Sequence, residues 1–358
     1  NILANHLDRV NKYHLDPQDI FNAIRATHKD IRGAYACLAM IIGHGMVAFR
    51  DPFGIRPLVL GKREENGSVE YMFASESVAL DVAGFELVRD VAPGEAIYVT
   101  FDGQLYAEQC AESAVLNPCI FEYVYFARPD SNIQGVNVHT ARKRMGRLLA
   151  AEQPVDADLV VGVPNSSLSA AMGFAEAAGL PNEMGLVKNQ YIARTFIEPT
   201  QERRERAVRM KLSAVPSVVE GKRVVLVDDS IVRGTTSKFI VRMLREAGAS
   251  EVHIRIASPA FKYPSFYGVD MQTTEELLAA NYTMSEMQEM LGVDSLAFLS
   301  VDGLVEAIDL PYEGNGTGLT TAYFDGHYPS PIYDYEPTLA DAKAAGQVDF
   351  QPEPTTTY

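Results

Sequence analysis

Residues 223–237 read RVVLVDDSIVRGTTS, and the rest of the chain is arranged around this stretch. Residues 224–227 form a continuous apolar run of the kind that is buried on both faces of a parallel sheet. Two adjacent carboxylates, Asp228 and Asp229, end the run, and a loop of small and hydroxyl residues leads into a helical pattern. Such a loop can hold a phosphate on its backbone N–H groups, with the carboxylates one step away for sugar hydroxyls or Mg²⁺.

An isolated Asp-Asp pair before Gly-Thr-Thr is equally compatible with an ordinary βα turn. The full stretch is more specific, because VLVDDSIVRGTTS resembles the phosphoribosyl pyrophosphate (PRPP) motif of type I phosphoribosyltransferases. The DSIVRGTT segment resembles the glutamine-PRPP amidotransferase (amidophosphoribosyltransferase) family. By that resemblance, Asp228 and Asp229 position the ribose hydroxyls and the metal. The residues implied to bind the 5′-phosphate are Ser230, Val232, Arg233, Gly234, Thr235, Thr236 and Ser237.

Composition indicates a globular protein with room for two domains. The chain has 358 residues, of which 47% are hydrophobic, and a net charge of −16. This charge argues against non-specific nucleic-acid binding, and no apolar stretch approaches the roughly 20 residues that span a bilayer. Three cysteines give neither zinc spacing nor a disulfide framework. The default expectation is a cytoplasmic protein without nucleic-acid or membrane partners.

Residues 1–112 alternate hairpin and helix patterns, which predicts an α+β sandwich. Residues 1–29 read as amphipathic helix, and residues 33–49 read as a hairpin broken at Gly-His-Gly. The string RDPFGIRPL at 50–58, followed by ASE at 74–76, resembles the glutaminase domain of the N-terminal-nucleophile amidotransferases. The resemblance implies that residues 1–112 are the C-terminal part of that domain.

No glutaminase nucleophile can be assigned in this part. The family uses an N-terminal cysteine whose own α-amino group is the base, whereas Asn1 stands first here. Cys37 lies among apolar residues that would raise its pKa, so we interpret it as a structural thiol. We therefore expect an N-terminally truncated chain that starts partway through the domain and supports, at most, synthesis from free ammonia.

Residues 117–132 (NPCIFEYVYFARPDSN) resemble the segment at the junction of the family's two domains. By composition alone the alternating aromatics predict a core strand. After the junction, the resemblance implies an α/β phosphoribosyltransferase domain with a parallel sheet over residues 113–335. Residues 336–358 would form a tail that is partly disordered.

A second phosphate-binding turn is predicted after the apolar strand DLVVGVP at 158–164. Ser166 and Ser167 follow it and open a small-residue helix, which suits pyrophosphate. Taken alone, this is a turn and a helix cap. By resemblance Ser166 helps to bind the metal, while Asn165 replaces the family's acid, which puts a role for that side chain in doubt.

Residues 185–212 carry a basic run between these two turns. A solvated charged loop is the ordinary interpretation, and a mobile lid over pyrophosphate is the functional one. The run resembles the family's flexible loop, K-N-x-Y-x-x-R-T-F-I-x-P-x-Q. That resemblance implies Lys188, Arg194, Gln201, Arg209 and Lys211 as substrate-binding residues, and Phe196 and Ile197 beside an ammonia path.

Some members of the family carry a [4Fe–4S] cluster on four cysteines. Cys119 stands where one ligand would be, Ser265 stands in place of another, and residues 314–323 contain no cysteine where the last pair would fall. Because one thiolate cannot hold such a cluster, we predict no iron–sulfur centre.

These resemblances imply an enzyme of purine biosynthesis, a pentosyltransferase that forms 5-phosphoribosylamine from PRPP and glutamine-derived ammonia. Mg²⁺ is the implied cofactor and pyrophosphate the leaving group. Purine nucleotides are implied inhibitors, and a homo-oligomer, a tetramer, is the implied assembly. Two alternatives share the PRPP loop. A salvage phosphoribosyltransferase would not need residues 1–112, and a PRPP-binding regulator would be expected to carry a DNA-binding domain.

Overall fold

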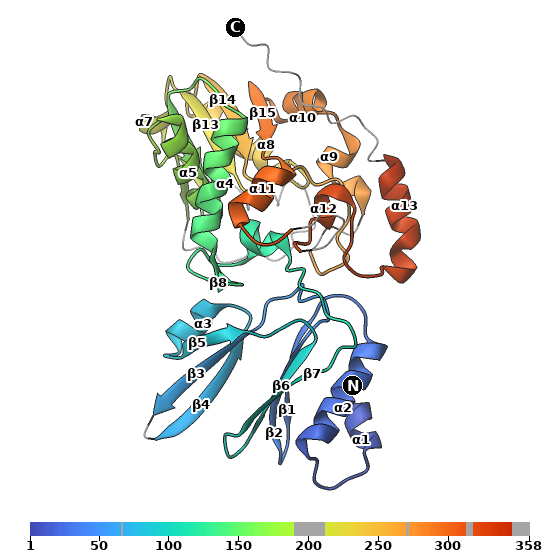
Figure 1. The fold of residues 1–358 in the computed structure, drawn as a ribbon. Coiled ribbons are helices and arrows are strands. Elements are labelled where there is room, and N and C mark those ends of the chain that lie inside the picture. The colour runs from blue at the N-terminus through green and yellow to red at the C-terminus, as the bar shows by residue number, and fades with distance from the viewer. Residues whose placement is uncertain (66, 190–211, 270, 272, 313–317, 346–358) are drawn as a thin grey trace.

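The computed structural model describes residues 1–65, 67–189, 212–269, 271, 273–312 and 318–345. Two bodies follow one another along the chain (Figure 1). The first holds two antiparallel sheets and the second holds a parallel sheet flanked by helices. The order therefore agrees with the predicted α+β part followed by an α/β part. Within the described ranges, no helix is both long and apolar enough to cross a membrane.

The first body is built from hairpins, as the sequence predicts. One sheet has the order β1-β2-β6-β7 and the other β4-β3-β5, all antiparallel. The predicted hairpin turns at residues 42–44 between β1 and β2. The strands are β1 (Ala36–Ile41), β2 (Gly45–Arg50), β3 (Val59–Glu65), β4 (Ser68–Ala74), β5 (Glu86–Asp90), β6 (Glu95–Thr100) and β7 (Leu105–Gln109).

The amino-terminal helix expected over residues 1–29 is two helices instead. α1 spans Ile2–Arg9 and α2 spans Pro17–Asp30, and both lie beside the β1-β2-β6-β7 sheet (Figure 1). The interruption has a local cause, because Asp16 caps α2 by accepting a hydrogen bond from the Asp19 amide, and Pro17 occupies the first turn. α3 (Ser77–Val82) follows β4.

The junction segment is helical where composition favoured a strand. Residues Glu122–Phe126 form η1, a single π-helical turn. Alternation of aromatics failed as a guide here because these rings pack in several directions; Phe121, for example, contacts both Phe126 and Phe261. Short strands β8 (Asn132–Ile133) and β9 (Val136–Asn137) follow.

The second body is organised by a parallel sheet in the order β10-β13-β14-β15. The strand β13, with its acidic end, is central in this sheet, as its apolar run predicts. Alternate residues of β13 enter two different cores, with Val225 and Val227 on one face and Val224 and Leu226 on the other. The strands are β10 (Leu159–Gly162), β13 (Arg223–Asp228), β14 (Glu251–Ile256) and β15 (Ser295–Phe298), and a separate ribbon pairs β11 (Leu186–Lys188) with β12 (Leu212–Ala214).

Helices cover both faces of this sheet (Figure 1). The tail predicted to be partly disordered contains a helix over residues 336–345, and residues 346–358 lie outside the described part. The helical segments are α4 (Val138–Glu152), α5 (Leu168–Ala178), α7 (Pro216–Val219), α8 (Thr235–Glu246), η2 (Thr274–Glu276), α9 (Leu278–Asn281), α10 (Met284–Leu291), α11 (Val301–Ile308), α12 (Ala322–Asp325), η3 (Tyr333–Tyr335) and α13 (Glu336–Ala345).

Two glycines let α4 and α5 approach until their backbones touch. A Cβ atom on Gly146 would overlap the Ala170 carbonyl oxygen, and one on Gly173 would overlap the Lys143 carbonyl oxygen. Neither overlap can be relieved by a side-chain rotation, because the obstructing atoms belong to the backbone. The contact fixes α5, whose amino end carries the turn at residues 165–167.

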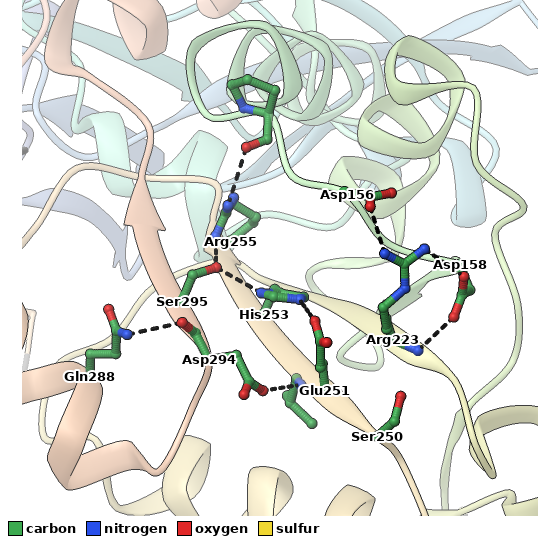
Figure 2. Close-up of polar contacts among 12 residues, drawn as sticks. Asp156, Asp158, Arg223, Ser250, Glu251, His253, Arg255, Gln288, Asp294 and Ser295 are labelled. Atoms are coloured by element: carbon green, nitrogen blue, oxygen red, sulfur yellow. Dashed lines mark hydrogen bonds and ion pairs between the residues drawn. The ribbon is translucent and has the colours of Figure 1, made fainter. Parts of the chain in front are cut away.

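At the amino ends of the parallel strands lies a polar network (Figure 2). The Arg223 guanidinium donates to Asp156 at 2.6 Å and to Asp158 at 2.9 Å, and the Arg223 amide also donates to Asp158. His253 lies between Glu251 and Ser295, 2.9 Å from each. This network therefore lies at the edge of the parallel sheet opposite to the one that carries Asp228 and Asp229.

Gly146→Ala should lower stability by roughly 1–3 kcal/mol, since the added methyl forces α4 and α5 apart. Thermal unfolding would measure the loss, with Ala151→Ser, at an exposed position of α4, as the control. An unchanged unfolding midpoint for Gly146→Ala would show that the two helices are not packed this closely.

A second prediction concerns acid stability. Hydrogen bonds from Arg223 lower the pKa of Asp158 to about 2. Because the folded-state pKa is depressed, the stabilisation is fully present above about pH 4 and disappears as the pH falls toward 2. Unfolding midpoints measured over that range should fall less steeply in Asp158→Asn than in the unmodified protein. Asp81→Asn, an exposed carboxylate on α3, should keep the original slope.

Candidate functional site

Two turns meet at the carboxyl edge of the parallel sheet. One follows β10 and contains residues 164–167, and its Pro164–Asn165 peptide is cis. The other follows β13 and begins at Asp228. β10 and β13 are adjacent parallel strands, with Gly162 opposite Val227, so the two turns emerge side by side. The structure thus brings together the two turns predicted to bind phosphate.

Serine hydroxyls from the first turn donate to the carboxylates of the second. Ser167 Oγ donates to Asp228 Oδ1 at 2.8 Å and lies 3.3 Å from Asp229 Oδ2, and Ser166 Oγ also donates to Asp229 Oδ2. Ser230 Oγ donates to Asp229 Oδ1 at 2.7 Å, and the Asp229 amide donates to Asp228 Oδ1 at 2.9 Å. Hydroxyl and amide donors therefore satisfy much of the acceptor capacity of both acids.

The two acids are held in a setting that opposes their ionisation. Burial and the neighbouring Asp229 carboxylate raise the pKa of Asp228 to about 8. Burial also raises the pKa of Asp229, which is 7% exposed, against the lowering effect of its hydroxyl donors and of Arg142. A cation that approached both carboxylates would relieve this cost, because opposite charge favours the ionised form.

The loop after the acids opens α8 at Gly234. This residue has φ of +72°, and a Cβ atom there would lie 2.9 Å from a methyl group of Leu278, so glycine meets both constraints. Because glycine brings no side chain to the N-cap position, the first-turn amides of α8 are left for another acceptor. Thr235 and Thr236 are exposed at this helix start, and Ser237 is buried.

Other predicted site residues lie in varied settings. The Arg233 guanidinium donates to Glu276 at 2.6 Å, and the Val232 carbonyl accepts from the Leu278 amide at 2.8 Å. Asn165 is exposed in the turn, and Lys188 is exposed at the end of β11. Arg194, Phe196, Ile197, Gln201, Arg209 and Lys211 lie outside the described residues.

Arg142 is a residue that sequence reasoning did not select. It is 3% exposed on α4, its guanidinium donates to the carbonyls of Tyr123 and Ala127, and its charge acts on Asp229. The sequence does indicate that Arg142 is buried, because its spacing places it on the same inward helix face as Met145 and Leu149. A lone arginine in an apolar stripe needs buried acceptors.

The donor chemistry of the site fits a metal ion that is shared with a ligand. No group of three or more His, Cys, Asp or Glu side chains that could hold a metal occurs in the described part of the chain. Mg²⁺, however, is commonly bound through one or two carboxylates together with substrate phosphate oxygens and waters. Asp228 and Asp229 supply such carboxylates beside two turns that could accept phosphate.

Comparisons with known proteins agree across both bodies. The phosphoribosyl transferase domain family matches residues 142–262. The amidophosphoribosyltransferase of Haemophilus influenzae is 57% identical over 335 residues, covering 92% of this chain and 66% of the relative. That of Escherichia coli is 51% identical over 314 residues, covering 86% of this chain and 62% of the relative.

A solved structure is similar over the same extent. It is the glutamine PRPP amidotransferase from Bacillus subtilis complexed with ADP and GMP, with 49% identity and a TM-score of 0.81. The alignment covers 92% of this chain and 70% of that one. The chain thus spans just under two thirds of the length of the curated relatives it matches.

The serine–carboxylate contacts lead to a stability prediction. Ser167→Ala should cost roughly 1–3 kcal/mol, because it removes a donor shared by two buried acids. Thr236→Ala, at an exposed position of the same site, is the matched control and should stay within about 0.5 kcal/mol of the unmodified protein. Urea unfolding of both variants measures the difference, and equal midpoints would show that Ser167 does not stabilise the acid pair.

Proposed function

This chain belongs to the amidophosphoribosyltransferase family, and we propose that it takes part in forming 5-phosphoribosylamine from PRPP and ammonia derived from glutamine. The observation that carries the proposal is the meeting of two phosphate-type turns around the acids Asp228 and Asp229. Identity of 57% to a relative over both bodies supports the same assignment. The proposed activity is that of a pentosyltransferase in purine biosynthesis.

The turn after β13 is proposed to bind the ribose 5-phosphate end of PRPP. The first-turn amides of α8, which no described side chain caps, and the hydroxyls of Thr235, Thr236 and Ser237 suit a phosphate. Ser230 and Gly234 shape the same loop. Backbone groups of Val232 and Arg233 complete it. The Arg233 side chain is engaged with Glu276, so we assign its contribution to the backbone.

The turn after β10 is proposed to bind pyrophosphate. Ser166 and Ser167 stand at the start of α5, close to the acids. Their hydroxyls donate to carboxylates here, and a ligand with its metal would take over those carboxylate oxygens. The hydroxyls are then released to contact the ligand or the metal. Lys188, at the end of β11, is proposed to approach the same group from another element.

Asp228, Asp229 and Ser166 are the residues proposed to hold Mg²⁺. When bound with PRPP, this ion would offset the charge of the pyrophosphate leaving group. The carboxylates would also accept hydrogen bonds from the ribose hydroxyls. In that position their negative charge favours the positive charge that develops on the ribose ring.

In the proposed reaction the protein positions ammonia and PRPP and offsets the charge of the leaving pyrophosphate. A C–N bond forms at C1 of the ribose as the C–O bond to pyrophosphate breaks, and the ammonia nitrogen then loses a proton to solvent. No side chain needs to form a covalent bond in this step. Neither the salvage transferase nor the PRPP-binding regulator is favoured, because the relatives match through residues 1–112 as well.

Two further proposals, nucleotide inhibition and assembly into a homo-oligomer, are based on the family resemblance. The Bacillus subtilis relative was solved with ADP and GMP. We extend this to a proposal that purine nucleotides inhibit the present protein, and that it assembles as a homo-oligomer, a tetramer. Size-exclusion chromatography with light scattering, with and without GMP, tests both proposals when combined with an inhibition assay.

Asp228→Asn and Asp229→Asn should each reduce PRPP turnover roughly 100-fold or more, since each loses a charge that positions metal and sugar. Pyrophosphate release with PRPP, Mg²⁺ and ammonium measures the effect. Glu246→Gln, an exposed acid at the far end of α8, is the control. Full turnover in either aspartate variant would overturn the proposed site.

A further inference from the structure

A buried polar cluster ties together three segments that are far apart in sequence, and it shares no residue with the turns at 164–167 and 228–237. Its members are Cys119 near the junction, Ser265 in the loop after β14, and Thr320 and Tyr323 near the end of the second body. Their exposed fractions are 0%, 3%, 0% and 0%. We call these four residues the Tyr323 cluster.

A ladder of backbone hydrogen bonds supports the cluster. The amides of Asn117 and Cys119 donate to the carbonyls of Phe53 and Ile55, at 2.7 and 3.1 Å. On the other side, the Thr320 amide donates to the Pro118 carbonyl at 3.0 Å, and Cys119 and Thr320 form a parallel bridge. The first body, the junction and the carboxyl-terminal segment are therefore joined in one place.

Side chains reinforce the same connection. Thr320 Oγ1 donates to the Asn117 carbonyl at 2.8 Å, and Asn117 Oδ1 accepts from the Gly318 amide at 2.7 Å. Asn117 is itself only 2% exposed, so these bonds are shielded from water. Buried hydrogen bonds of this kind stabilise one arrangement, because breaking them leaves polar groups without partners.

The Tyr323 phenol lies at the centre of the cluster. Its oxygen is 3.1 Å from Cys119 Sγ, and the Ser265 side chain is a hydrogen-bond neighbour of the same phenol. The Tyr323 carbonyl accepts from the amides of Lys262 and Tyr263, at 3.0 and 3.1 Å. The ring packs against Phe121 and Phe261. One residue thus holds the loop after β14 against the junction.

These residues do not fit the iron–sulfur cluster that some family members carry. By the family resemblance, Cys119 and Ser265 stand where two ligands of such a cluster would be, and the Tyr323 phenol contacts both side chains. Of the four residues in the Tyr323 cluster only Cys119 can supply a thiolate, whereas a [4Fe–4S] cluster needs four such ligands.

We infer that the Tyr323 cluster is an iron-free connector, in which hydrogen bonds centred on a tyrosine join the carboxyl-terminal segment to the domain junction. The connection uses only groups that the chain itself supplies. Its strength is accordingly independent of iron supply, and it does not require the proposed transferase activity to be correct.

The first test measures iron directly. Protein produced in iron-rich medium and purified without oxygen should contain well under one iron and one acid-labile sulfide per chain. Its unfolding midpoint should match that of protein produced under iron depletion. Stoichiometric iron with sulfide, or a midpoint that depends on iron supply, would overturn the inference.

The second test removes one oxygen atom. Tyr323→Phe keeps the ring and loses the hydroxyl, so hydrogen exchange at the amides of Thr320, Lys262 and Tyr263 should accelerate roughly five- to tenfold. Tyr282→Phe, on an exposed tyrosine, should leave those rates unchanged. Unchanged exchange in Tyr323→Phe would show that the phenol does not hold these segments.

Cys119 provides an independent variant if Tyr323→Phe does not fold. Cys119→Ser retains a hydrogen-bonding side chain and should protect the Thr320 amide better than Cys119→Ala. Equal protection in the two Cys119 variants would contradict a hydrogen-bonded connector, since only the hydroxyl of serine can replace the thiol contact.

Discussion

Two carboxylates are held side by side in a mostly buried setting, and among the described residues hydroxyl groups rather than salt bridges stabilise them. Burial of such groups is costly unless hydrogen bonds or a cation compensate it. Ser166 and Ser167 supply part of this compensation from a neighbouring turn, which must then be placed accurately. The contact between Gly146 and Ala170 achieves that placement, because it fixes the helix that begins directly after the serines. The close packing of α4 against α5 therefore helps to place the serine hydroxyls beside Asp228 and Asp229 at the carboxyl edge of the parallel sheet.

Much of the second body was predictable from sequence because its signals are local. The apolar run before Asp228 and the small residues of α5 indicate strands and helices without reference to the rest of the chain. Paired helices replaced the single helix expected near the amino terminus, although the Asp-Pro signal at 16–17 was available. The strand β5 and the helical turn η1 were missed. Phe121, directly before η1, contacts Phe126, Phe261 and Tyr323, and a linear pattern does not encode such packing.

Candidate site residues could be proposed from sequence where their motif is contiguous, and the structure shows which of them lie together. Asp228, Asp229 and the serines are brought together as expected, whereas Arg142 came to light only from three-dimensional packing. Arg50 is a similar case, fully buried and donating to the carbonyls of Gly54, Arg56 and Val91. Such arginines satisfy irregular backbone that lacks its own hydrogen bonds. Their acceptors come from turns, so composition cannot identify them in advance.

The junction segment connects the site to the Tyr323 cluster through continuous contacts. Arg142, whose charge acts on Asp229, donates to two carbonyls at the ends of η1, and Phe121 just before η1 packs on Tyr323. These contacts show that the acid pair and the Tyr323 cluster rest on the same junction segment. Allosteric coupling between them would require a second conformation whose population both sites change. The hydrogen bonds of Arg142 and the ring contact between Phe121 and Tyr323 are all present in this one conformation. The backbone of η1 and the residue that follows it therefore supply the carbonyls that hold the Arg142 guanidinium, whose charge acts on Asp229.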